Sequence, residues 1–210
     1  MKQLVWKEFF LQRKLLLLYM ILPIYGALKN PEESFTIAII YFFTCSLMIF
    51  VSLYQEDKNK TDRVLASLPL KRRQIVIGKY MAYILFVLYG FIVSSILLVC
   101  IQMLFYNEIY MPLYAVFLGV SLAVLYVSFI LPVAVDGNQQ FVMIVNAFMV
   151  IPMISLLAFM SNILSDPRLT LMIFKTENVT FIITVLFLVA LVVYMLSMII
   201  SIVAFEHKEL

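Results

Sequence analysis

The sequence predicts an all-α integral membrane protein, in which six transmembrane helices follow a short interfacial helix at the N-terminus. Of its 210 residues, 65% are apolar and 13% are charged, whereas soluble domains average about 45–50% apolar and about 25% charged residues. The chain therefore has too few charges to cover a soluble globule of its size. A helix that crosses the bilayer core needs about 20 apolar residues, so we expect about six spans in a single transmembrane domain, residues 1–210.

Residues 1–14 are expected to form an amphipathic helix at the membrane surface. Its apolar face holds Val5, Trp6, Phe9 and Phe10, and off that face lie Lys2, Gln3, Lys7 and Lys14. A basic helix with a Trp/Phe face suits the lipid headgroup boundary. The alternative is that these residues are simply the hydrated start of the first span.

Six apolar segments follow as predicted spans. They cover about residues 15–28, 35–54, 75–105, 112–135, 141–160 and 179–205. The first is short and is interrupted by Pro23 and Gly26. The third is longer than a bilayer requires, which predicts that it tilts or that its first turns emerge into water. The longest connections are a polar inner loop, 55–74, and an outer loop, 161–178. An aromatic belt at one membrane surface is indicated by Tyr106, Tyr110 and Tyr114.

Lysine and arginine are unequally divided between the two sides of the membrane. With the N-terminus inside, the inner segments hold 12 of the 15 Lys and Arg residues, and only Lys29, Arg168 and Lys175 lie outside. Short loops rich in Lys and Arg stay in the cytoplasm. The pattern predicts a multi-pass plasma-membrane protein with both termini cytoplasmic.

The groups that catalysis and proton coupling require are missing from the predicted spans. The spans contain no Asp or Glu, and their only basic residue is Lys79, near the inner surface. The single histidine, His207, lies in the tail, so neither a Ser–His pair nor a histidine metal site can be placed. The sequence around Gly78-Lys79 lacks the other residues of a phosphate-binding loop. We therefore expect no enzyme activity, metal or cofactor on this chain, and ATP hydrolysis, if needed, on another chain.

The inner loop contains a short predicted helix with one apolar edge. Thr61 can cap its start and Pro69 marks its end. Val64, Leu65 and Leu68 share one face at helical spacing. An apolar edge on a charged cytoplasmic helix suits a groove on a partner protein. From the spacing alone, packing against this protein's own membrane face is an equal alternative.

Residues 65–80, LASLPLKRRQIVIGKY, resemble the loop after span two in permeases of type-2 ABC exporters. Those proteins also have six spans, cytoplasmic termini and an N-terminal amphipathic "elbow" helix. The resemblance therefore covers the layout of the whole chain and about 25 residues of motif. Within the class, the chain looks similar to small permeases that export amphipathic peptides such as phenol-soluble modulins.

The resemblance implies that residues 56–68 form a coupling helix that docks on a separate ATPase subunit, with the turn at 136–140 as a smaller second contact. Two permease copies, or a permease and a related subunit, would join two ATPases, which would bind ATP and Mg. The expected partners also include membrane lipid and amphipathic peptide cargo, but no nucleic acid. The residues implied in ATPase coupling are Glu56, Asp57, Lys60, Thr61, Arg63, Val64, Leu65, Leu68, Asp136 and Asn138.

Two helical patterns inside the spans concern packing. In the fourth span, Ala115, Gly119 and Ala123 allow close helix approach, either inside the bundle or at a dimer seam. In the fifth, one face repeats at helical spacing as Gln139, Met143, Asn146, Val150, Met153, Leu157 and Met160. Flexible methionines recur at promiscuous binding surfaces, although such a stripe also suits ordinary core packing. The candidate residues for a cargo path are Met143, Asn146, Met149 and Met153.

The sequence thus favours the permease subunit of an ABC exporter for amphipathic or hydrophobic cargo, with peptides as the expected class. A channel or facilitator that needs no nucleotide is the alternative, and a membrane-embedded enzyme is less favoured. Asn146 is the strongly polar side chain at the centre of the fifth span and needs a partner or water.

Overall fold

The computed structural model is helical in the residues that it describes. These are Trp6 and residues 21–29, 34–58, 72–105, 113–135 and 176–206, with 142, 144–146, 148, 149, 151, 152 and 155. The named helices are α2 (Ile21–Lys29), α3 (Ser34–Lys58), α5 (Arg72–Phe105), α6 (Leu113–Val135) and α9 (Thr176–Glu206). No strand occurs in this part of the chain.

Four of these helices are long and apolar enough to cross a membrane. The spans are Thr36–Gln55, Arg73–Phe105, Leu113–Val135 and Phe181–Glu206, which confirms the second, third, fourth and sixth predicted spans. At about 1.5 Å per residue, α5 is about 50 Å long, well beyond a hydrocarbon core of about 30 Å. Of the first predicted span, residues 21–28 are described and belong to the short helix α2. The rest of that span, more than half of the fifth and the interfacial helix except Trp6 fall outside the described residues and stay predictions.

The helices extend further than the apolar runs alone indicate. α3 continues to Lys58 and α5 begins at Arg72, so residues 55–58 and 72–74, which the sequence analysis assigned to the inner loop, are helical. Once a helix has started, each added residue gains one backbone hydrogen bond. Polar residues can therefore extend the helix beyond the bilayer. Similarly, α2 runs through Pro23 and Gly26 to Lys29, so neither residue ends the helix.

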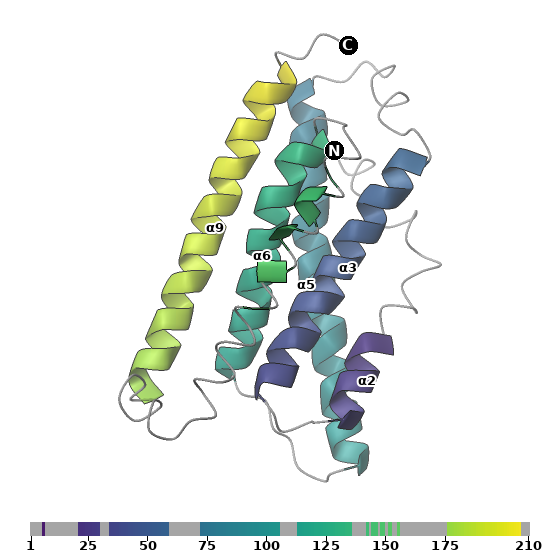
Figure 1. Ribbon diagram of the computed structural model, residues 1–210, viewed down its shortest axis with the longest axis vertical. Coiled ribbons are helices and arrows are strands. Elements are labelled where there is room, and N and C mark those ends of the chain that lie inside the picture. The colour runs from purple at the N-terminus through teal and green to yellow at the C-terminus, as the bar shows by residue number, and fades with distance from the viewer. Residues whose placement is uncertain are drawn as a thin grey trace.

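The long helices form an upright bundle whose connections alternate between its two ends (Figure 1). The end of α3, the start of α5 and the ends of α6 and α9 lie together at the top of the view, and the opposite ends of these helices lie at the bottom. Because α6 and α9 run in the same direction, the chain between Val135 and Thr176 must return from one end of the bundle to the other. The inner and outer ends grouped by the charge pattern therefore correspond to the two ends of the bundle.

Helix α6 is the centre of the bundle. It packs most extensively against α9 and α3, and also against α5. A Cβ atom added at Gly119 would lie 2.5 Å from the Ala38 carbonyl oxygen and 2.8 Å from the Tyr41 Cβ atom. Ala115 and Ala123 are also buried. The small residues of α6 therefore serve close α3–α6 packing inside the bundle, and the alternative of a dimer seam on this face is wrong.

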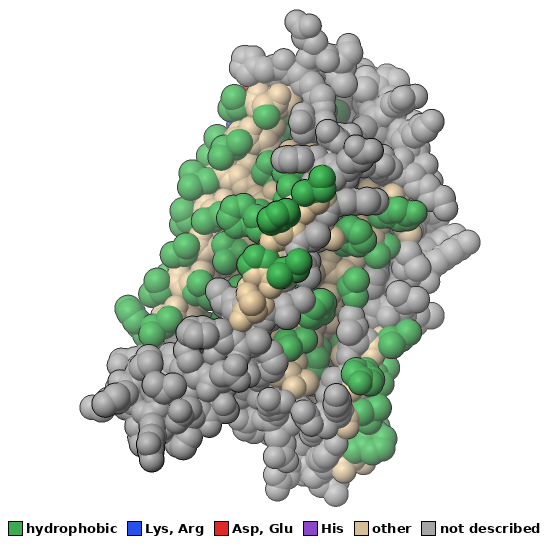
Figure 2. Space-filling view, in the orientation of Figure 1, with side chains coloured by type: hydrophobic (Ala, Val, Ile, Leu, Met, Phe, Trp, Pro, Cys, Tyr) green, Lys and Arg blue, Asp and Glu red, His purple; other side chains and the backbone are tan. Residues whose placement is uncertain are grey.

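The outer surface of the bundle is apolar. In α9, only 22% of the most apolar stretch is buried inside the molecule, against 67% in α6. Figure 2 shows hydrophobic side chains along the visible length of α9 and over α2. In water such a surface would be strongly unfavourable, whereas lipid chains cover it without loss. The exposed apolar surface and the composition therefore both indicate that the bundle is surrounded by a lipid bilayer.

Candidate functional site

The predicted coupling residues gather at one end of the bundle, as far as the structure describes them. Glu56 and Asp57 belong to the last turn of α3, and α5 begins after the connection at Arg72. In the first turn of α5, Arg73 and Gln74 are exposed. Lys60, Thr61, Arg63, Val64, Leu65, Leu68, Asp136 and Asn138 lie outside the described residues, and their coupling role stays a prediction.

Of the predicted cargo-path residues, Asn146 and Met149 are described, whereas Met143 and Met153 are not. Both described side chains are half-buried. The Tyr126 hydroxyl of α6 donates a hydrogen bond of 2.6 Å to the Asn146 Oδ1 atom, and Met149 packs against the hydrophobic core. The expected partner of Asn146 is therefore a buried tyrosine.

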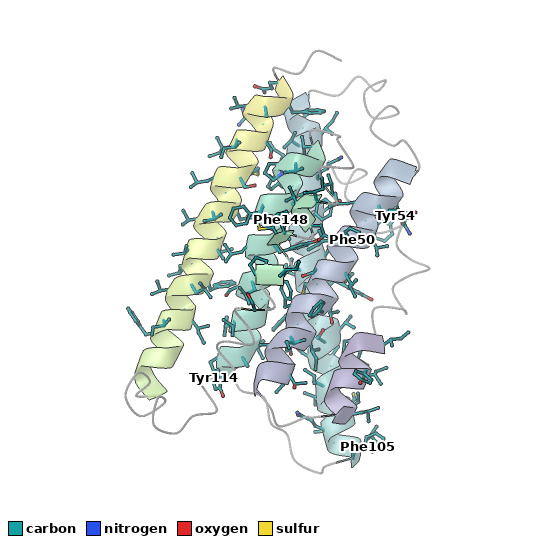
Figure 3. All side chains as sticks on the ribbon, in the orientation of Figure 1. Phe50, Tyr54, Phe105, Tyr114 and Phe148 are labelled. Atoms are coloured by element: carbon teal, nitrogen blue, oxygen red, sulfur yellow. The ribbon has the colours of Figure 1, made fainter. Side chains whose placement is uncertain are left out.

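The opposite face of this segment is exposed. Ile144, Phe148, Ile151 and Ser155, spaced by four, three and four residues, are all exposed. Figure 3 places Phe148 at about the level of Phe50 in α3, within the height of the bundle. The face with Asn146 and Met149 thus points to the bundle interior, and the apolar face points away from it.

Tyr126 also joins this segment to α3. Its ring meets that of Phe42 edge-on at a centroid distance of 6.3 Å, and the Tyr126 side chain is 1% exposed. One side chain of α6 therefore packs on α3 with its ring and binds Asn146 with its hydroxyl. A change at Asn146 would leave this hydroxyl without its acceptor in an apolar interior, which is unfavourable.

A second polar cluster joins α5, α6 and α9 toward the end of the bundle where α5 begins and α6 and α9 end (Figure 1). The Tyr80 hydroxyl lies 2.8 Å from the Ser197 Oγ atom and 2.7 Å from the Ser201 Oγ atom. The Ser197 hydroxyl donates a hydrogen bond of 2.6 Å to the backbone carbonyl of Ser128. The Tyr194 hydroxyl donates to the backbone carbonyl of Tyr80. All five residues are buried, so no bulk water competes for these bonds.

A third contact joins α3 and α5. The Tyr41 hydroxyl lies 2.8 Å from the Ser95 Oγ atom, and the Ser95 hydroxyl donates to the Phe91 carbonyl at 2.8 Å. Because the single hydroxyl hydrogen of Ser95 is used on Phe91, Tyr41 must donate to Ser95. The helices are thus connected by tyrosines that each reach across to another helix.

Sequence reasoning missed these interhelical tyrosines. Tyr80 was noted only as the end of the LASLPLKRRQIVIGKY run, and Tyr41, Tyr126 and Tyr194 were not singled out. A usable signal was present: in spans, tyrosine is enriched at the membrane interfaces, and a buried Tyr hydroxyl usually has a hydrogen-bond partner. A tyrosine well inside a predicted span therefore indicates an interhelical hydrogen bond.

The arrangement is suited to holding and moving helices. These cross-helix bonds, together with the contact from the Cys45 thiol to the Val87 carbonyl, join neutral hydroxyl, amide, thiol and carbonyl groups. In the described part of the chain, no three His, Cys, Asp or Glu residues lie close enough to hold a metal ion. Lys79, 8% exposed, is the charged residue among the buried side chains described, and it lies near the start of α5.

Comparison with protein families identifies one match. The family described as "ABC-2 family transporter protein" matches residues 3–206, which is nearly the whole chain. Neither the curated proteins nor the solved structures contain a match to this chain.

Proposed function

The chain belongs to the ABC-2 family of transporters, as a membrane-spanning permease subunit, and from this premise we propose that it exports amphipathic or hydrophobic cargo, with peptides as the cargo class. The family match over residues 3–206 carries the permease assignment, and the cargo class is supported only by the resemblance of the chain to small peptide-exporting permeases. Permeases of this kind are generally non-catalytic, so the energy for export comes from ATP and Mg on a partner ATPase.

Coupling to that ATPase takes place at residues 56–68, with the 136–140 turn as a second contact. Two features support this assignment. The ends of α3 and α6 and the start of α5 lie at one end of the bundle (Figure 1), so both connections emerge on the same side. The inner loop carries an apolar edge, Val64, Leu65 and Leu68, within a charged sequence.

The cargo path is proposed along the face of the fifth segment that carries Met143, Asn146, Met149 and Met153. On this face Asn146 and Met149 are half-buried, and flexible methionines tolerate varied side chains of a cargo. Lipid covers the outer faces of the bundle. A second copy of the chain, or a related permease, completes the transporter in the plasma membrane, with both termini cytoplasmic.

The test is reconstitution of the permease with its partner. The tagged permease is purified from its own cells, co-purifying chains are identified, and the complex is placed in vesicles. We expect an ATPase to co-purify and the vesicles to accumulate a fluorescent amphipathic peptide only with ATP. A scrambled peptide of equal composition without an apolar face is the matched cargo control. The permease alone should neither hydrolyse ATP nor drive uphill transport.

Two outcomes would contradict the proposal. Peptide movement by the permease alone, down its gradient and without ATP, would favour the channel or facilitator instead. Equal transport of the amphipathic and scrambled peptides would leave the permease assignment in place and remove the proposed cargo class.

A further inference from the structure

A proline inside α6 leaves one backbone carbonyl without its helical donor. Pro132 lies within α6, which continues to Val135. Proline has no backbone N–H group, so residue 132 cannot form the usual i to i−4 hydrogen bond to the Ser128 carbonyl. An unsatisfied carbonyl is unfavourable at membrane depth, where water is absent. The Ser197 hydroxyl of α9 donates to this carbonyl at 2.6 Å.

The number of hydroxyl hydrogens determines which group donates at each contact of this cluster. A serine or tyrosine hydroxyl carries a single hydrogen, and Ser197 uses its hydrogen on the Ser128 carbonyl. Tyr80 must therefore donate to Ser197 across the 2.8 Å contact. Since the Tyr80 hydrogen is then used, Ser201 must donate to Tyr80 across the 2.7 Å contact. The chain of donors runs from Ser201 through Tyr80 and Ser197 to the Ser128 carbonyl.

We propose that this chain of hydrogen bonds, here called the clamp, makes the inner ends of α5, α6 and α9 move as one unit. The Ser128 carbonyl, which Pro132 leaves without a helical donor, is the anchor of the clamp. The proposal rests on the proposed function, because the unit would receive its movement from the ATPase. Tyr80 lies roughly two helical turns after Arg72, the first residue of α5 after the inner connection. A displacement of that connection is thereby passed from α5 to α6 and α9.

The surroundings of the clamp favour a rigid connection. Tyr80 and Ser201 are each 1% exposed, and hydrogen bonds in such a low-dielectric interior strengthen one another along a chain. The Tyr80 and Tyr194 rings also meet edge-on at a centroid distance of 5.3 Å. Tyr194 adds a donor to the Tyr80 carbonyl, so α5 and α9 are joined at both the ring and the backbone of Tyr80.

The anchor is tested by a double-mutant cycle on the full permease in nanodiscs. Pro132→Ala supplies the missing N–H to the Ser128 carbonyl, so the Ser197 hydroxyl becomes dispensable there. Ser197→Ala should lower the thermal midpoint by about 2–4 °C in the natural background and by less in the Pro132→Ala background, where only the loss of the Tyr80 hydroxyl's acceptor remains. The control is Ser121→Ala, whose hydroxyl bonds the Phe117 carbonyl within α6 and whose effect should be equal in both backgrounds.

If Ser197→Ala lowers the thermal midpoint equally in both backgrounds, Pro132 does not create the need for the Ser197 hydrogen bond, and the proposed anchor is wrong. If Ser197→Ala fails to fold, the cycle is run with Ser197→Cys, whose thiol is only a weak donor, and Ser197→Thr, which keeps the hydroxyl, should retain a near-natural midpoint. Tyr80→Phe with Ser197→Ala forms a second cycle, because Tyr80→Phe keeps the ring contact and removes only the hydroxyl. Additive losses in that cycle would show that the hydroxyls do not act as a chain.

The movement is tested on the permease–ATPase complex isolated from cells. In Tyr80→Phe, hydrogen exchange should rise together at residues 72–80 and 128–135, and peptide transported per ATP hydrolysed should fall several-fold with the ATPase still bound. If the stability losses are non-additive but the amount of peptide transported per ATP hydrolysed is unchanged, the clamp stabilises the fold and has no role in movement. Failure of the proposed function would be seen separately, as loss of peptide transport in the natural protein, and would leave the stability cycles interpretable.

Discussion

At the scale of single residues, the close approach of α6 to α3 depends on a missing side chain. Gly119 of α6 lies against Ala38 and Tyr41 of α3, where an added Cβ atom would stand 2.5 Å from a carbonyl oxygen. That oxygen belongs to the backbone, so the whole of α3 would have to move to make room. Small residues that let helices approach closely are a general basis of helix packing in membranes, because burial of apolar surface contributes little to helix association in lipid.

Gly119→Ala is therefore expected to lower the free energy of unfolding by roughly 1–3 kcal/mol, seen as a lower thermal midpoint in nanodiscs. Gly90→Ala is the matched comparison, since its Cβ would lie 2.8 Å from the Cys45 Sγ atom, a side-chain atom. Adding Cys45→Ala should restore stability to Gly90→Ala and should not restore it to Gly119→Ala. Tolerance of Gly119→Ala without loss would contradict the described α3–α6 contact.

The Tyr126–Asn146 bond separates a structural role of Asn146 from a role in the cargo path. Asn146→Leu removes the acceptor of the buried Tyr126 hydroxyl, at a cost of about 1–3 kcal/mol. Adding Tyr126→Phe removes the unpaired hydroxyl, so the double variant should be more stable than Asn146→Leu alone.

Export measured on the same variants then decides the role. If the fifth segment lines the path, export stays altered in the stabilised double variant, and Met153→Ala also alters export without dissociating the complex. Recovery of natural export in the double variant would return Asn146 to a purely structural role.

At the scale of the elements, the inner connection between α3 and α5 is where energy should enter. Burying a Val or Leu side chain contributes about 1.5–3 kcal/mol, so the apolar edge of residues 56–68 will be covered either by the bundle or by a partner. Charged neighbours such as Arg63 would lie at the rim of a partner groove, where charges mainly tune approach and register.

Val64→Ser with Leu68→Ser should leave insertion and expression close to natural levels, sharply weaken ATPase co-purification and abolish export. Arg63→Glu should have a smaller effect that depends on salt concentration. Expression, co-purification and export are measured on the same preparations. Degradation of the double variant together with loss of ATPase binding in Arg63→Glu would mean that the loop couples through charge.

At the scale of the whole molecule, the arrangement of helix ends makes the orientation testable. The starts of α3, α6 and α9 and the end of α5 lie at one end of the bundle (Figure 1), and the charge bias predicts that this end is outside. Cysteines are placed one at a time at Asn107, Asp166 or Asn59 in a variant without Cys45 and Cys100. On intact cells an impermeant thiol reagent should label the first two and spare the third, because it reaches only the outer surface. Labelling at Asn59 alone would reverse the orientation.

Some of this architecture follows from the sequence because a bilayer admits few solutions. In the absence of water, backbone groups must be paired within the segment, so a long apolar run becomes a helix. The second, third, fourth and sixth spans could therefore be located before the structure was known. The helical ends at 55–58 and 72–74 could not be located in this way, because hydropathy indicates where a segment leaves the bilayer and does not indicate where the helix ends.

The sequence by itself determined that this chain is a membrane-spanning helical protein, and its inner-loop motif pointed to the transporter class that the family match identifies. Only the tertiary structure decided how the helices face one another. The spacing of Ala115, Gly119 and Ala123 favours an internal contact and leaves a dimer seam open until α3 is found against Gly119. Likewise Tyr80 and Ser197, 117 positions apart, meet only because α5 and α9 are rotated toward each other. Helix rotation depends on the packing of all neighbours at once, and no periodicity within a single apolar segment encodes it.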